Sequence, residues 1–134
     1  MADNTFMLEV VTPEDILLKE EIQFLVVPGS EGELGILKNH APIVASLKIG
    51  VLKYKMPDET VQKVAVSGGF MEVIDNVARV LAETAEHGAS VDVLRAKAAR
   101  ERAEKRLAQR VEGINNERAK LALQRAIARI KAAS

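Results

Sequence analysis

The chain has 134 residues, enough for one compact domain with an appendage but too few for most multidomain enzymes. Apolar residues make up 48% of it and charged residues 28%, which is typical of a soluble protein with a core and excludes a disordered chain. It has no cysteine, which excludes disulfides and thiol nucleophiles. With no tryptophan, one tyrosine and three phenylalanines, it nearly lacks the aromatic platforms that bind single-stranded nucleic acid.

The formal net charge is zero, but the charge is polarised along the chain. Residues 1–90 carry 7 basic and 14 acidic side chains, whereas residues 91–134 carry 12 basic and 5 acidic ones. This pattern indicates an acidic body and a basic arm whose partner is an acidic surface or a phosphate-bearing ligand. No apolar run approaches the ~18 residues of a membrane helix, so we expect an intracellular protein that does not insert into a membrane.

The first 90 residues consist of short runs rich in Val, Ile and Leu that are separated by turn signals. Leu52 and Tyr54 alternate with Lys53 and Lys55, which predicts a strand with one buried face. Turns are predicted at 28–32, 56–59 and 75–76, where Gly, Pro, Asp and Asn gather. We therefore expect an antiparallel β-sandwich. Its predicted strands are 5–11, 16–27, 48–56, 61–66, 70–74 and 77–81.

After Ser90, 11 of the last 44 residues are alanine, the best helix former. Ser90 is the predicted N-cap of a first helix, with Asp92 in its first turn. Gly113 interrupts the pattern, and a second helix follows, which predicts an antiparallel helical hairpin. The expected apolar faces are Leu94, Ala98, Leu107 and Val111 on the first helix and Ala119, Leu123, Ala126, Ile127 and Ile130 on the second. The fold class is thus α+β, with a sandwich at 1–88 and a hairpin at 89–134.

Catalytic and metal motifs are nearly absent. There is no P-loop, dinucleotide fingerprint or His-Glu-x-x-His pattern. Ser67, before Gly68 and Gly69, faintly resembles a nucleophile elbow, but a tight glycine turn between two strands is the structural alternative that we favour. His40 and His87 lie in different predicted loops without a third ligand. We expect no catalytic residues and no metal site.

Three segments together resemble a known family. They are residues 32–42 (GELGILKNHAP), 65–73 (AVSGGFMEV) and 92–98 (DVLRAKA), and the resemblance to the ε subunit of bacterial F-type ATP synthases covers essentially the whole chain. The resemblance implies a non-catalytic rotor subunit that docks on γ and the c-ring. It also implies that the mobile helices contact the α and β subunits and restrain ATP hydrolysis, at the cytoplasmic face of the bacterial membrane.

The tail is also similar to the ATP-binding members of that family, whose signature is Ile or Leu, Asp, two variable residues, Arg and Ala. Residues 91–96 read VDVLRA, so Val91 departs from the signature by one methylene. The resemblance implies ATP as a regulatory ligand. Matching positions would place Glu86, Val91, Asp92 and Ala96 around the nucleoside and Arg95, Arg102, Arg125 and Arg129 around the phosphates.

Helical spacing gives the arginines an independent argument. Arg95 and Arg102 are seven residues apart and Arg125 and Arg129 four, so each pair shares a helix face. A hairpin folded about Gly113 brings Arg102 level with Arg125, and four permanently charged guanidiniums would suit a triphosphate. A solvated helix face or a docking surface would explain the same arginines.

The hypothesis is therefore a switch in which ATP favours the closed hairpin and its loss releases the basic helices toward the catalytic subunits. The alternative is a basic helical hairpin that binds nucleic acid or another acidic partner. Net neutrality, the acidic body and the absence of aromatics in the tail argue against nucleic acid.

Overall fold

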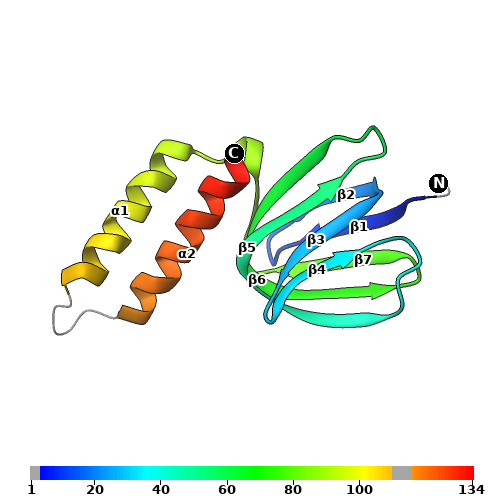
Figure 1. Ribbon diagram of the computed structural model, residues 1–134, viewed down its shortest axis with the longest axis horizontal. Coiled ribbons are helices and arrows are strands. Elements are labelled where there is room, and N and C mark those ends of the chain that lie inside the picture. Colours follow the sequence, from blue (N-terminus) through cyan, green and yellow to red (C-terminus); the bar gives the residue numbers. More distant parts are fainter. Residues whose placement is uncertain (1–3, 110–115) are drawn as a thin grey trace.

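The computed structural model describes residues 4–109 and 116–134, which form a β-domain followed by two helices (Figure 1). In the described part of the chain the strands are β1 (Phe6–Val11), β2 (Ile16–Ile22), β3 (Phe24–Gly29), β4 (Gly32–Ile36), β5 (Ile43–Lys55), β6 (Val61–Ile74), β7 (Val77–Ala82) and β8 (Ala85–His87). A 3₁₀ turn, η1 (Gly88–Ser90), leads into α1 (Val93–Gln109) and α2 (Asn116–Ala133). The predicted fold class, a sandwich followed by a helix pair, is confirmed.

The strands follow the order β2-β1-β7-β6-β5-β3-β4, with β8 paired to β6. Neighbouring strands are antiparallel except β1 and β7, which run parallel. The sheet closes as a sandwich over one core, and the long strands β5 and β6 also present an outer surface to α2. Alternation within the strands supplies the core side chains, among them Phe6, Leu8, Ile22, Leu25, Leu52, Val64, Met71 and Val80.

Several predicted strand limits were wrong. The run 16–27 is two strands that meet at Gln23, whose amide donates to the Lys55 carbonyl at 2.8 Å. β4 was missed because it contains two glycines and a polar edge, and the predicted 28–32 turn narrows to the link between β3 and β4. Periodicity alone does not reveal such a break or such a glycine-rich strand.

The segment Ser67–Gly69 is not a turn between two strands, because β6 continues through it. Gly68 and Gly69 have φ values of 105° and 135°, a region that side-chain-bearing residues rarely adopt. A Cβ on Gly69 would also lie 2.0 Å from the Leu81 carbonyl oxygen. The glycines therefore allow close approach of β7 within a continuous strand.

The two helices lie side by side and run in opposite directions, with α2 between α1 and the β5–β6 surface (Figure 1). Asp92, not Ser90, caps α1, since its Oδ1 accepts a hydrogen bond from the Arg95 amide at 3.0 Å. Gly113 and Val111 fall outside the described residues.

Small side chains occupy the helix contacts. Ala96 and Ala103 are buried on α1, and Ala119, Ala126, Ala128 and Ala132 are buried on α2. The predicted apolar stripe of α1 was wrong at Leu94, which is 80% exposed, and at Ala98, which is exposed as well, while Leu107 is half-buried. On α2 the prediction holds for Ala119 and Ala126, while Leu123, Ile127 and Ile130 are half-buried.

Candidate functional site

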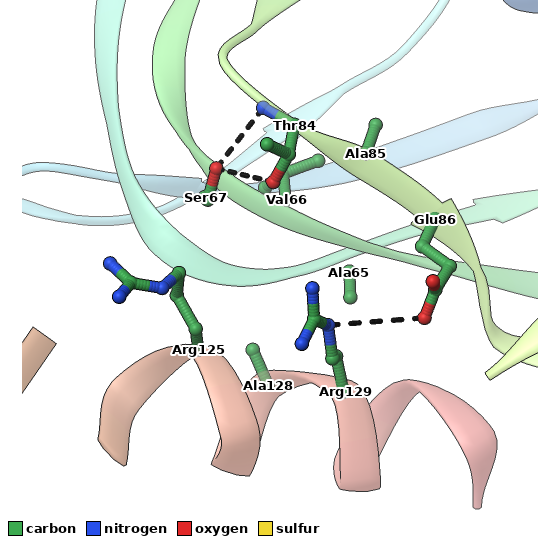
Figure 2. Close-up of a pocket in the computed structure, with 9 residues that line it drawn as sticks. All are labelled: Ala65, Val66, Ser67, Thr84, Ala85, Glu86, Arg125, Ala128 and Arg129. Atoms are coloured by element: carbon green, nitrogen blue, oxygen red, sulfur yellow. Dashed lines mark hydrogen bonds and ion pairs between the residues drawn. The ribbon is translucent and has the colours of Figure 1, made fainter. Parts of the chain in front are cut away.

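A small pocket lies where α2 crosses the sandwich (Figure 2). Its walls come from three places in the chain: β6, the β7–β8 segment and α2. The enclosed volume is about 80 Å³, well below the ~300–1,000 Å³ of typical ligand pockets, so a larger ligand would extend onto the open surface. The lining residues are Ala65, Val66, Ser67, Thr84, Ala85, Glu86, Arg125, Ala128 and Arg129.

A local break in strand pairing builds the upper wall of the pocket. β6 pairs with β8 up to Val66 and with β7 from Gly69 onward, so Ser67 lies opposite the link between β7 and β8. The Ser67 amide donates to the Thr84 carbonyl at 3.1 Å, and the Ser67 hydroxyl accepts from the Thr84 amide at 3.1 Å. The two hydroxyls are also hydrogen-bonded to each other. Ser67 thus fastens a strand junction, which gives it a structural role in place of the nucleophile role considered from the sequence.

The lower wall carries the charge of the site. Arg125 and Arg129 rise from α2, and Figure 2 shows Arg129 reaching toward Glu86 on β8. The Arg129 Nε and Glu86 Oε1 atoms are 3.9 Å apart, and both side chains are about 40% exposed, so this ion pair is weak. Among the described residues no ion pair is formed by Arg125. With two guanidiniums and one carboxylate, the pocket favours an anion.

The first turn of α1 holds the other part of the predicted site. The Val91 amide donates to the Gly88 carbonyl at 3.2 Å and closes η1, and Asp92 caps the helix. Ala96, 2% exposed, is buried in the hairpin, while Arg95 and Arg102 are exposed. Neither Arg95 nor Arg102 lines the pocket.

The handedness of the helices relates the two groups of arginines. Arg95 and Arg102 each precede a buried alanine of α1, and Arg125 precedes the buried Ala126 of α2. Successive helix residues are rotated by about 100°, and in two antiparallel helices the position before a contact residue lies on the same flank of both. Arg129 is rotated by only about 40° from Arg125. All four arginines therefore lie on one flank of the hairpin, the flank that β8 adjoins through Glu86.

We call this surface the arginine flank and define it by Glu86, Arg95, Arg102, Arg125 and Arg129. All five are among the residues that the resemblance implies for an ATP site, which stays a prediction. The sequence missed Ser67 and Thr84, which line the pocket, because only the strand break brings them together. Of these two residues the sequence singled out only Ser67, because it precedes two glycines.

Two classes of site find no support in the part of the chain that the structure describes. No group of three or more His, Asp or Glu side chains there could hold a metal ion. The His40 Nδ1 atom lies 2.7 Å from the Ala41 carbonyl oxygen, and His87 belongs to β8. Neither α1 nor α2 combines the length and the apolar character that a membrane span requires.

Comparison with known proteins identifies relatives along the whole chain. Residues 5–88 match the sequence model of the ATP synthase delta/epsilon chain β-sandwich domain, and residues 90–134 match that of its long α-helix domain. The chain is 70% identical over 132 residues to the ATP synthase epsilon chain of Syntrophomonas wolfei, covering 98% of this chain and 96% of that one. It is 59% identical over 130 residues to the epsilon chain of Desulfitobacterium hafniense strain Y51, covering 97% of each.

A solved structure supports the same fold. A chain in the mitochondrial ATP synthase of Euglena gracilis, determined as an OSCP/F1/c-ring assembly, superposes with a TM-score of 0.84. The match covers 99% of this chain and 83% of that chain at 23% identity, so it speaks for the fold alone.

Proposed function

The chain belongs to the ATP synthase delta/epsilon chain family, and we propose that it is a regulatory central-stalk subunit of a bacterial F-type ATP synthase. It is a structural subunit without catalytic residues. The sandwich, assigned to residues 1–88, would join the γ subunit to the c-ring at the cytoplasmic face of the membrane. The helices, assigned to 89–134, would contact the α and β subunits.

We propose further that the arginine flank binds ATP. The observation that carries this proposal is the placement of Arg95, Arg102, Arg125 and Arg129 on the same side of a hairpin whose neighbouring strand contributes Glu86. A triphosphate would extend from the pocket along this side of the hairpin, because the small pocket cannot enclose it. Charge-assisted, bidentate contacts of the guanidiniums would give the ligand its affinity.

The nucleoside would lie at the start of α1, near Glu86, Val91 and Asp92. The Asp92 carboxylate accepts a hydrogen bond from the Arg95 amide, which holds the carboxylate in place before any ligand binds. Ala96 is buried, and its contribution would be to let the helices approach closely enough for both sets of arginines to reach one ligand. No metal ion is needed by this arrangement of residues.

ATP would then regulate the subunit by holding the hairpin closed. Only the closed hairpin places arginines from α1 and α2 on one flank, so ATP binds that form and shifts the equilibrium toward it. When ATP is scarce, the basic helices would leave the sandwich and restrain hydrolysis by contacting the catalytic subunits.

Two experiments test the proposal at its two levels. Pull-down of γ by the full chain tests the place of the subunit in the stalk, and its failure would refute that assignment. Calorimetry with ATP tests the ligand, with one ATP per chain expected. Absence of heat at millimolar ATP would leave the arginine flank as a helix surface or a protein-docking surface.

A further inference from the structure

Gly88 lies in η1, at the point where the sandwich passes into α1, and it is buried. A Cβ at this position would lie 2.0 Å from the main-chain oxygen of Ala132, 2.7 Å from the carbonyl carbon of the same residue, and 3.3 Å from the Lys63 oxygen. These neighbours are backbone atoms, so no rotamer change can make room for a side chain. The backbone of Gly88 itself is not in the left-handed region. Space, not backbone conformation, demands glycine here.

The same contact holds the last turn of α2 on the sandwich. The Lys63 Nζ donates to the Ser134 main-chain oxygen at 2.8 Å, and Ala132 is buried beside it. Arg129 lies one helical turn before this contact, and Glu86 lies two residues before Gly88. The position of the last turn of α2 therefore sets the distance between Arg129 and Glu86, which both line the pocket.

We infer that Gly88 is the positioning residue of the arginine flank: its missing side chain lets α2 seat on the sandwich and so aligns Arg125 and Arg129 with β8. The seating rests on the contacts at Gly88 and on the Lys63–Ser134 hydrogen bond, whereas its consequence for ATP rests on the proposed function. A side chain at residue 88 displaces the last turn and shifts the balance between seated and released α2. Overpacking of this kind corresponds to a shift of roughly tenfold or more.

The test compares Gly88→Ala with Ala89→Val in the full-length chain. Ala89 lies in the same turn but is exposed, so we expect solvent to accommodate the added bulk of its replacement. Spin labels on cysteines introduced at the exposed residues Gln62 and Lys131 report the distance between β6 and the end of α2, and the native chain has no cysteine to interfere. We expect the short-distance population to shrink in Gly88→Ala and to persist in Ala89→Val. An unchanged distance distribution in Gly88→Ala would overturn the inference.

A second variant guards against misfolding. Thermal unfolding of the sandwich should show the same cooperative transition in Gly88→Ala as in the wild type. If Gly88→Ala does not fold, Lys63→Met replaces it, because this variant removes the bond to Ser134 without adding bulk. A smaller loss of the short-distance population is then expected, and no loss would count against the seating of the last turn.

Titration with ATP separates this inference from the proposed function. If ATP binds only the seated form, its apparent dissociation constant rises in Gly88→Ala by the factor by which the seated fraction falls, and saturating ATP restores the short distance. A role confined to stability would not produce this restoration. If the wild type binds no ATP but Gly88→Ala still releases α2, the positioning role of Gly88 stands and the ATP proposal fails.

Discussion

Replacement of Arg125 by alanine tests the phosphate side of the proposed site most directly. Arg125 lines the pocket and is half-buried, and its removal breaks no ion pair among the described residues. A hydrogen bond to a charged group is worth about 1.5–3 kcal/mol. Loss of the Arg125 contact should therefore weaken ATP binding by roughly 10- to 150-fold, at about 1.4 kcal/mol per factor of ten.

Isothermal titration calorimetry on the full-length subunit measures this change. Lys120→Ala is the matched control, since Lys120 is an exposed cation on the same helix. It follows the buried Ala119 instead of preceding a buried alanine, which places it on the opposite flank of the hairpin. Both variants lose one positive charge, so a general change in net charge would weaken ATP binding equally in both.

The position of Arg125 on the arginine flank predicts different ATP affinities for the two variants. Arg125→Ala should bind ATP at least tenfold more weakly while Lys120→Ala stays near the wild-type affinity, and both should keep the wild-type helix content. Equal losses in the two variants would show that the nucleotide responds to net charge and not to the arginine flank. An unchanged affinity in Arg125→Ala would refute the assignment of this side chain to the phosphates.

Three further predictions concern the parts of the subunit and its charge network. A chain that ends at residue 88 should fold and bind γ, and an assembled complex that contains it should hydrolyse ATP faster at low ATP; an unfolded fragment by circular dichroism would contradict the two-part organisation. Fluorophores on cysteines introduced at residues 97 and 134 should lie close together with ATP and separate without it, most clearly at low salt. Their separation should approach about 50 Å if the helices extend end to end. Equal transfer efficiency with and without ATP, in the free and the assembled subunit, would refute the switch. The hydrogen bond from Arg79 Nε to Glu9 Oε2, 2.8 Å long, lowers the pKa of Glu9 below its ordinary value. Arg79→Met should therefore lower the thermal unfolding midpoint near neutral pH, and this difference should fade as the pH falls through the depressed pKa. A difference that persists in acid would assign the effect to packing.

The charges around Glu9 explain why the sign of that effect is fixed by the fold. Glu9 on β1 lies opposite Lys19 on β2 and Arg79 on β7, and Arg79 lies opposite Glu72 on β6. The row alternates in sign across four strands, and the Glu9 carboxylate, between Lys19 and Arg79, is stabilised in its charged form. A folded-state pKa below the unfolded value adds stability above the unfolded pKa and loses it in acid.

Local sequence signals were sufficient where the structure depends on period and composition. Alternation at Leu52 and Tyr54 identified the second part of β5, although the strand begins at Ile43 and not at residue 48 as predicted. The alanine-rich tail formed the two expected helices. Local sequence signals failed where contact with a distant segment determines the local structure. Ser67–Gly69 became part of β6 because β7 and β8 approach it, and Asp92 displaced Ser90 as the cap because η1 occupies Ser90.

The site shows the same division. Helical spacing predicts that the two arginines of each helix share a face, because spacing along one helix is a local property. The resemblance implies Glu86 as well. The flank's neighbours depend on how α2 meets the sandwich. Ser67, Thr84 and Gly88 come from separate elements, and no periodicity in the sequence links them to Arg129.

The alanines at the helix contacts would allow the proposed switch between two arrangements of the helices. α1 packs mainly on α2, and the buried residues it contributes are Ala96 and Ala103, which bury little apolar surface compared with leucine. The attraction between the helices is therefore modest, while cations gathered on one flank repel each other across the same contact. A triphosphate bound as proposed would turn this repulsion into a net attraction and leave the apolar contact unchanged. Alanine also favours the helix whether or not it is packed, so opening of the hairpin need not melt either helix. A leucine-rich seam would hold the hairpin closed regardless of ligand, whereas under the proposed switch the weak alanine contact would let the charge on the arginine flank decide between the two forms.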